Sequence, residues 1–130
     1  MRKLIIGSVA AAIALTAGVV TVLAQAKAED KTVEGELVDM WCFSKGGAKG
    51  DGHAACGEKC AKTGIPTGVV VDGKATTLIT NPEPLAASMG RTVRVTGKMN
   101  ADTNVILPSK VEVKKDDKWE EVKLKDQHHK

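Results

Sequence analysis

Hydrophobic and polar residues alternate along several short stretches of this 130-residue chain. A period of two is typical of strands that bury one face. In residues 32–40, for example, Val33 and Leu37 share one face while two glutamates occupy the other. Further strands are expected at residues 68–71, 74–80, 91–99, 105–107, 111–113 and 119–124. The pattern therefore predicts a mainly β protein.

Other segments interrupt the strand pattern. Residues 53–62 contain good helix formers, and the Gly-Ile-Pro sequence at 64–66 would end a helix there. The glycine-rich residues 44–52 are expected to form a flexible loop without regular structure. Asp72-Gly73 tolerates the backbone angles of a type I′ turn and so predicts a hairpin. Residues 85–89 predict a single helical turn.

The order of these elements matches a small Greek-key barrel of the OB type. Gly35 and Gly97 lie inside expected strands and suit the sharp bends of a small barrel. We predict one OB-like domain over residues 32–125, with one short helix and an inserted Cys/His loop and helix at residues 41–66. A flat sheet or a sandwich of the same strands is the alternative.

The N-terminus has the pattern of a secretory signal peptide, which would occupy residues 1–26. Two basic residues precede an apolar stretch, and small-x-small sites end at Ala26 and at Ala28. We expect cleavage after one of these alanines and a periplasmic or secreted protein without a stable membrane anchor, although retention as a membrane span is the alternative. A polar lead at residues 27–31 would precede the domain, and a polar tail at residues 126–130 would follow it.

Composition argues against a nucleic-acid partner. The formal net charge of +3 falls to +1 once the two basic residues of the expected signal peptide are removed, so the basic pI indicates nothing about nucleic acid. The chain has no tyrosine, one phenylalanine and two tryptophans, which leaves few rings on which bases could stack. No nucleic-acid binding is expected.

All three cysteines and the only histidine outside the C-terminal tail lie within nineteen residues: Cys42, His53, Cys56 and Cys60. In a helix over residues 53–62 the last three would share a face, and the glycine-rich loop is long enough to bring Cys42 over from the end of the first strand. Three cysteines and one histidine are a recognised tetrahedral set for zinc, and thiolate-rich sites also take Cu(I). We therefore predict a Zn or Cu site that serves structure, sensing or carriage.

Two neighbours of Cys42 are candidates to support such a site. Asp39 is placed to accept a hydrogen bond from a ligating histidine and so to fix its tautomer, or else to bind loop amides as an ordinary strand-end aspartate. Trp41 and Met40 would alternate in direction along the strand, so that one of them shields the site; Trp41 is the candidate.

A disulfide is the main alternative, because an exported protein meets an oxidising compartment. Pairing Cys42 with Cys56 or Cys60 would staple an OB-like module that binds a protein or small molecule without metal, and would leave one spare thiol. Thiol-redox activity stays open, although the C-x-x-C pattern is absent. Nothing marks an oxyanion hole or a substrate pocket, so we predict that the chain is not an enzyme.

The residues around the cysteines carry the motifs V-D-x-x-C, H-x-x-C-x-x-x-C and G-I-P, which begin at Val38, His53 and Gly64. In these motifs the chain resembles a group of small exported bacterial proteins of unassigned function, which have a barrel-like C-terminal half. The resemblance covers residues 33–71 in specific motifs. It implies that Asp39 and the four Cys/His residues act as a unit, and it implies no activity.

Overall fold

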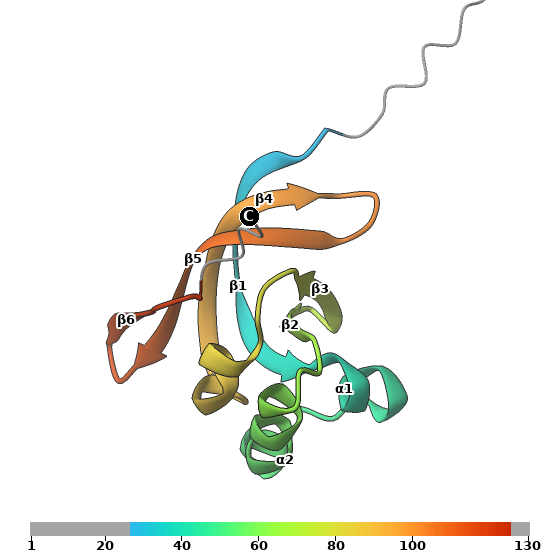
Figure 1. Cartoon of the computed structure of the whole chain (residues 1–130), viewed down its shortest axis with the longest axis vertical. Helices are drawn as coiled ribbons and strands as arrows, with labels where there is room; N and C mark the ends of the chain where they lie inside the picture. The colour runs from blue at the N-terminus through green and yellow to red at the C-terminus, as the bar shows by residue number, and fades with distance from the viewer. Residues whose placement is uncertain (1–26, 126–130) are drawn as a thin grey trace, which may run out of the picture.

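The computed structural model describes residues 27–125, so the expected signal peptide and the expected C-terminal tail lie outside the described residues. Strands hold 46% and helical segments 25% of that part of the chain, as expected for a mainly β protein. The elements, shown in Figure 1, are β1 (Glu29–Asp39), α1 (Met40–Gly46), α2 (Asp51–Lys62), β2 (Thr67–Val71), β3 (Lys74–Leu78), the 3₁₀ helix η1 (Glu83–Ser88), β4 (Thr92–Asn100), β5 (Val105–Lys115) and β6 (Lys118–Val122).

Five of the strands close into a barrel. The strand order is β3-β2-β1-β4-β5-β6, and neighbouring strands pair antiparallel. A short parallel pairing of β3 with β5 closes the circle, while β6 continues outward from β5. With η1 between β3 and β4, this confirms the predicted OB-like barrel in place of a flat sheet or a sandwich.

The barrel interior is filled by aliphatic side chains from alternating strand positions. On β4, Val93 and Val95 are fully buried, whereas Thr92 is exposed. On β1, Leu37 is fully buried at the end nearest the helices. The buried cluster comprises Leu37, Ala61, Val69, Leu78, Leu85, Ala86, Met89, Val93, Val95, Ile106, Val111 and Val113. The alternation in the sequence thus marks the core face of the sheet.

Two strand glycines allow neighbouring backbones to approach closely. A Cβ atom on Gly35 would lie 2.2 Å from the Val70 carbonyl oxygen, and one on Gly97 would lie 2.1 Å from that of Leu107. The register between β4 and β5 also shifts next to Gly97. These contacts exclude any side chain at either position, in agreement with the predicted bends.

The structure corrects several details of the expected elements. Residues 29–31, expected in a polar lead before the domain, are the start of β1 and pair with β4. Residues 44–46, expected in a loop, belong to α1, and the first strand ends at Asp39 before Cys42. The two apolar runs at 105–107 and 111–113 form the single strand β5. The chain also holds more helix than expected, because α1 adds to α2 and η1. Figure 1 shows all three helical segments gathered at one end of the barrel.

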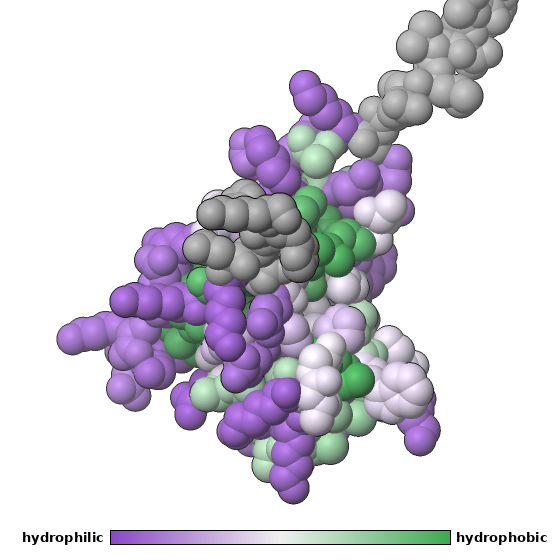
Figure 2. Space-filling view, viewed as in Figure 1, coloured by the Kyte–Doolittle hydropathy of each residue, from purple (hydrophilic) through white to green (hydrophobic). Residues whose placement is uncertain are grey.

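The surface is polar around the hairpin between β5 and β6, where Figure 2 shows mainly hydrophilic side chains. Arg94 lies over the Trp119 ring at 4.0 Å, and Lys115 pairs with Glu120 across the hairpin. The expected solvated edge at residues 114–121 is therefore confirmed. Among residues 27–125, no helix has the length and apolar character needed to cross a membrane.

Candidate metal site

Asp39 joins the barrel to the first helix and is the most buried polar residue of the site, with 0% of its surface exposed. It is the last residue of β1 and the N-cap of α1, where its Oδ1 accepts a hydrogen bond of 2.9 Å from the Cys42 N–H. An aspartate at this position satisfies an amide that the helix leaves free. Cys42 therefore lies in the first turn of α1, which corrects its expected place at the strand end.

Helix α2 carries the other three candidate ligands, as predicted. It packs against η1 and against the end of β1, and Gly57 is buried at this contact. A Cβ atom on Gly57 would lie 3.4 Å from Asp39 Oδ2 and 3.3 Å from the Met89 side chain. The one weak helix former in this segment thus allows α2 to lie close to Asp39.

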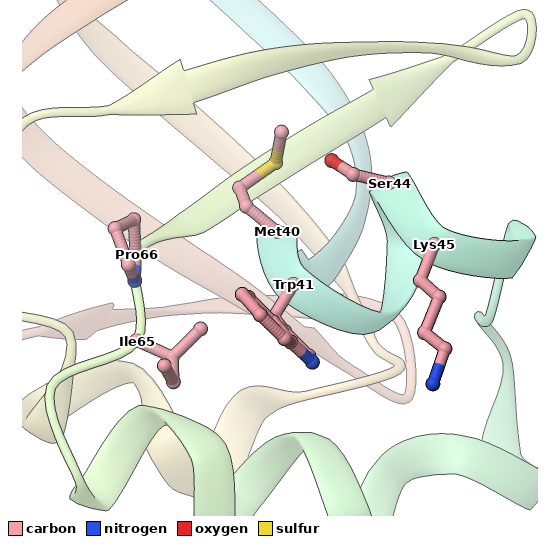
Figure 3. Close-up of a pocket in the computed structure, with 6 residues that line it drawn as sticks. All are labelled: Met40, Trp41, Ser44, Lys45, Ile65 and Pro66. Atoms are coloured by element: carbon pink, nitrogen blue, oxygen red, sulfur yellow. The ribbon is translucent and has the colours of Figure 1, made fainter.

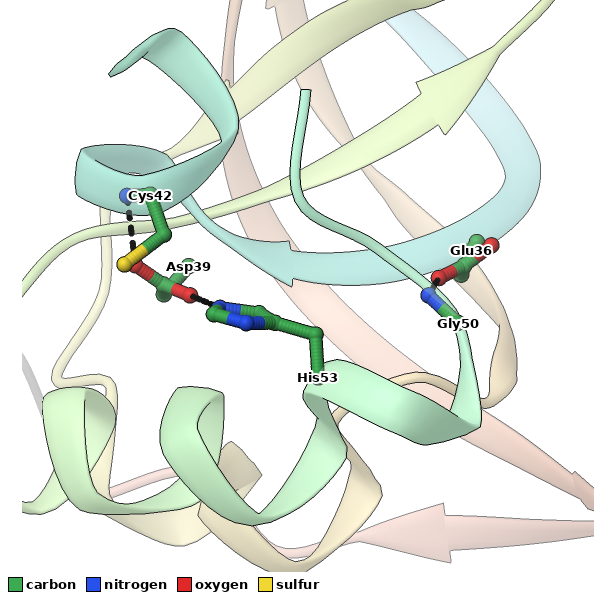
Figure 4. A network of polar contacts seen from close by, with 5 residues as sticks. All are labelled: Glu36, Asp39, Cys42, Gly50 and His53. Atoms are coloured by element: carbon green, nitrogen blue, oxygen red, sulfur yellow. Dashed lines mark hydrogen bonds and ion pairs between the residues drawn. The ribbon is translucent and has the colours of Figure 1, made fainter. Parts of the chain in front are cut away.

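His53 meets Asp39 across this contact, as Figure 4 shows. The distance between His53 Nε2 and Asp39 Oδ2 is 2.8 Å. Burial opposes ionisation of Asp39, but the hydrogen bonds from the Cys42 amide and from His53 outweigh it and lower the pKa of the carboxyl below its ordinary value. An ionised carboxylate only accepts hydrogen bonds, so Nε2 is the donor in this contact, and a neutral imidazole in this tautomer has its lone pair on Nδ1.

The four predicted ligands lie close enough together to bind one metal ion. Two overlapping groups have their ligand atoms within 4.8 Å of one another: Cys42 with His53 and Cys56, and Cys42 with Asp39 and Cys60. Cys42 belongs to both groups and is half-buried, as is Cys60, while Cys56 is exposed. The cluster thus has a buried side at Asp39 and a solvent side at Cys56.

The surroundings of Cys42 and Cys60 favour the protonated form of both thiols. Burial and the charges of Asp39, Cys56 and Cys60 raise the pKa of Cys42 to about 11. The pKa of Cys60 is also raised, again by burial and then by Asp39 and Cys56. Several anionic groups in one place disfavour one another, and a bound cation reverses this effect by favouring thiolates.

The structure gives no support to the disulfide alternative. Cys42, Cys56 and Cys60 are all free cysteines in the described residues. Cys56 and Cys60 are one helical turn apart on α2, and both thiols lie beside Cys42 on the neighbouring helix. The arrangement brings three sulfur atoms together around one point rather than selecting one pair.

Trp41 does not shield the cluster, contrary to the expectation from strand alternation. Because residues 40–46 are helical, the alternating directions of a strand do not apply to them. Trp41 is 66% exposed and lines a surface pocket with residues of α1 and of the segment after α2. None of the residues lining this pocket is a candidate ligand.

One residue that helps to place α2 could not be recognised from the sequence. Glu36 Oε1 accepts a hydrogen bond from the backbone N–H of Gly50, the N-cap of α2 (Figure 4). Glu36 lies at an outward position of β1 in the sequence pattern, and nothing in its neighbours indicates a contact fourteen residues away. The glycine-rich loop is thus tied to the barrel beside the cluster.

Comparisons with family models, curated proteins and solved structures find no match to this chain. The barrel that the resemblance implied is present. The relation to the small exported bacterial proteins stays a prediction, and the chemistry of the site must be argued from its own residues.

Proposed function

We propose that the chain binds a single Zn²⁺ or Cu⁺ ion through Cys42, His53, Cys56 and Cys60. The observation that carries the proposal is the convergence of two separate helices on one point beside a buried, ionised aspartate. A chance cluster of this kind is costly, because the barrel gains nothing from placing three thiols and a carboxylate together. A cation offsets that cost.

The donor set favours a soft or borderline metal. Thiolate and imidazole ligands suit zinc and monovalent copper, whereas calcium and magnesium prefer oxygen. Three thiolates and a neutral imidazole around Zn²⁺ leave one negative charge. Asp39 takes the role of orienting His53 through Nε2, which leaves Nδ1 for the metal.

The exposure of the site supports carriage or sensing over a purely structural role. Cys56 is exposed, so incoming ligands can reach the metal from the solvent side. None of the four candidate ligands belongs to the buried cluster of the barrel. The barrel is therefore expected to fold without metal. In the exported protein that the N-terminus predicts, metal would also protect the thiols from oxidation.

Metal analysis of the purified protein tests this proposal. Protein isolated from the exported fraction should contain about one equivalent of metal by mass spectrometry. His53→Ala should lose most of that metal at modest chelator concentration, because it removes one of four ligands. Ser44→Ala, an exposed change on the same helix as Cys42, is the matched control and should retain it.

Thiol counting separates metal binding from the disulfide alternative. After chelation under denaturing conditions, all three cysteines should react with a thiol reagent. A protein purified without reductant that holds no metal, shows one reactive thiol and is unaffected by His53→Ala would refute the proposal.

A further inference from the structure

A pocket of about 480 Å³ lies on the surface beside the cluster. Its walls are mainly apolar and come from both sides of the cysteine insertion (Figure 3). The lining residues are Met40, Trp41, Ser44, Lys45, Ile65 and Pro66. Trp41 is the most exposed large hydrophobic residue of the described chain. Water-exposed aromatic and aliphatic groups of this kind are typical of interaction surfaces.

The pocket and the cluster share their structural supports. Trp41 directly precedes Cys42 in the first turn of α1. On the other wall, the Ile65 N–H donates a hydrogen bond of 3.0 Å to the carbonyl oxygen of Cys60. A metal that holds Cys42 and Cys60 together would therefore also set the spacing between Trp41 and Ile65.

The charge of the pocket selects the chemistry of its occupant. Lys45 is the only charged residue that lines it, and no acidic residue does. Figure 3 shows the Trp41 and Lys45 side chains extending from the same side of α1. An apolar group next to a negative charge would match both features. The pocket is open, which suits a side chain that projects from a larger partner better than a small molecule that needs enclosure.

We propose that this pocket docks an apolar side chain of an acidic segment of a partner protein, and that metal in the cluster strengthens the docking. The second part rests on the proposed metal binding. A partner docked here would lie next to Cys42. The Sγ atoms of Cys42 and of the exposed Cys56 lie within 4.8 Å of each other. This position, next to the candidate ligands, is the one that a protein delivering or removing the metal would need.

A peptide probe tests the docking. The probe is a ten-residue peptide with one central leucine between aspartates, and its controls carry lysines in place of the aspartates or glycine in place of the leucine. By calorimetry, the zinc-loaded protein should bind the acidic leucine peptide at least tenfold more tightly than either control peptide. In Trp119→Phe, which keeps Trp41 as the only tryptophan, the same peptide should change the tryptophan fluorescence.

Surface variants locate the binding. Trp41→Ala and Lys45→Glu should each weaken binding of the acidic peptide at least tenfold, and Lys45→Glu should reverse the preference for aspartate over lysine. Leu107→Ala is the matched control, because Leu107 is similarly exposed, at 54%, but lies on β5 away from the pocket residues. Absence of binding, equal binding of the aspartate and lysine peptides, or normal binding by Trp41→Ala would overturn the docking proposal.

Metal removal tests the coupling. Chelation should weaken binding of the acidic peptide at least threefold in a protein shown to hold one equivalent of zinc. Equal affinities with and without zinc would refute the coupling while leaving the metal site intact. A protein that takes up neither zinc nor Cu⁺ refutes the proposed function and the coupling together, and the docking is then decided by the Trp41 and Lys45 variants.

Discussion

Replacing Asp39 by asparagine isolates the role of one buried carboxylate. Asparagine keeps the shape and still accepts the Cys42 N–H as an N-cap residue. The bond to His53, however, changes from a charge-assisted bond to a neutral one. Bonds to charged groups contribute about 1.5–3 kcal/mol and neutral ones about 1 kcal/mol, so the metal-free protein should lose about 0.5–2 kcal/mol of unfolding free energy.

The same substitution should also lower the affinity of the protein for zinc, through a separate effect on the tautomer of His53. An amide nitrogen facing His53 donates a hydrogen bond, which requires Nε2 to accept and moves the ring proton to Nδ1. That tautomer has no lone pair on Nδ1 for the metal. Loss of such a supporting carboxylate typically lowers metal affinity about 10–100-fold. Urea denaturation of metal-free protein and competition with a chromophoric zinc chelator measure the two effects.

Glu36→Gln is the matched control, since Glu36 is also a carboxylate of β1 that binds the α2 region, through Gly50 and not through His53. It should change zinc affinity less than about twofold, because the glutamine oxygen still accepts the Gly50 N–H and residue 36 makes no hydrogen bond to a candidate ligand. Zinc affinity that is unchanged in Asp39→Asn, or lowered equally in both variants, would show that Asp39 does not orient a ligand.

Three further predictions concern the barrel and the titrating groups. Val93→Asp should lower the unfolding free energy by about 3 kcal/mol or more in a denaturation experiment, and the change Thr92→Asp at its exposed neighbour by under about 1 kcal/mol. Equal losses would contradict the assignment of Val93 to the inner face of the barrel. Cys42 has a pKa of about 11, so at about pH 8 only roughly one thousandth of it is thiolate in metal-free protein. Iodoacetamide should therefore modify the exposed Cys56 before Cys42, as measured by mass spectrometry. Folding lowers the pKa of Asp39 from 3.8, so ionised Asp39 stabilises the folded protein above that pH, and this contribution is lost as pH falls. Between about pH 5 and pH 3, the unfolding free energy of the wild type should therefore fall more than that of Asp39→Asn.

The barrel could be predicted from the sequence because its signals are local. Alternation placed Val93 and Val95 inside, and Asp72-Gly73 adopts the two positive φ angles of 49° and 78° that the hairpin needs. The parallel pairing that closes the barrel joins Thr77 to Val105. No local sequence pattern indicates a contact between residues so far apart in the chain.

Helix α1 could not be predicted, because its sequence signals are weak. It is seven residues long, contains an aromatic pair and ends at glycines. Its N-cap Asp39 has no glutamate or glutamine three residues later to complete a capping box. The helix depends on tertiary contacts, including the hydrogen bond from the Met40 N–H to the Pro66 carbonyl oxygen.

The set of candidate ligands could be predicted from the sequence, but the positioning of α2 by Gly57 and Glu36 could not.

The central position of β1 in the sheet determines the order in which the protein can assemble. β1 pairs with β2 and also with β4, and the latter pairing joins Glu29 to Met99. Residues that lie so far apart in the chain come together slowly, so small barrels typically fold in milliseconds to seconds. His53, Cys56 and Cys60 lie within three turns of one helix and need no such closure. Three of the candidate ligands can therefore meet an ion during folding, and Cys42 completes the set only when β1 has found its partners.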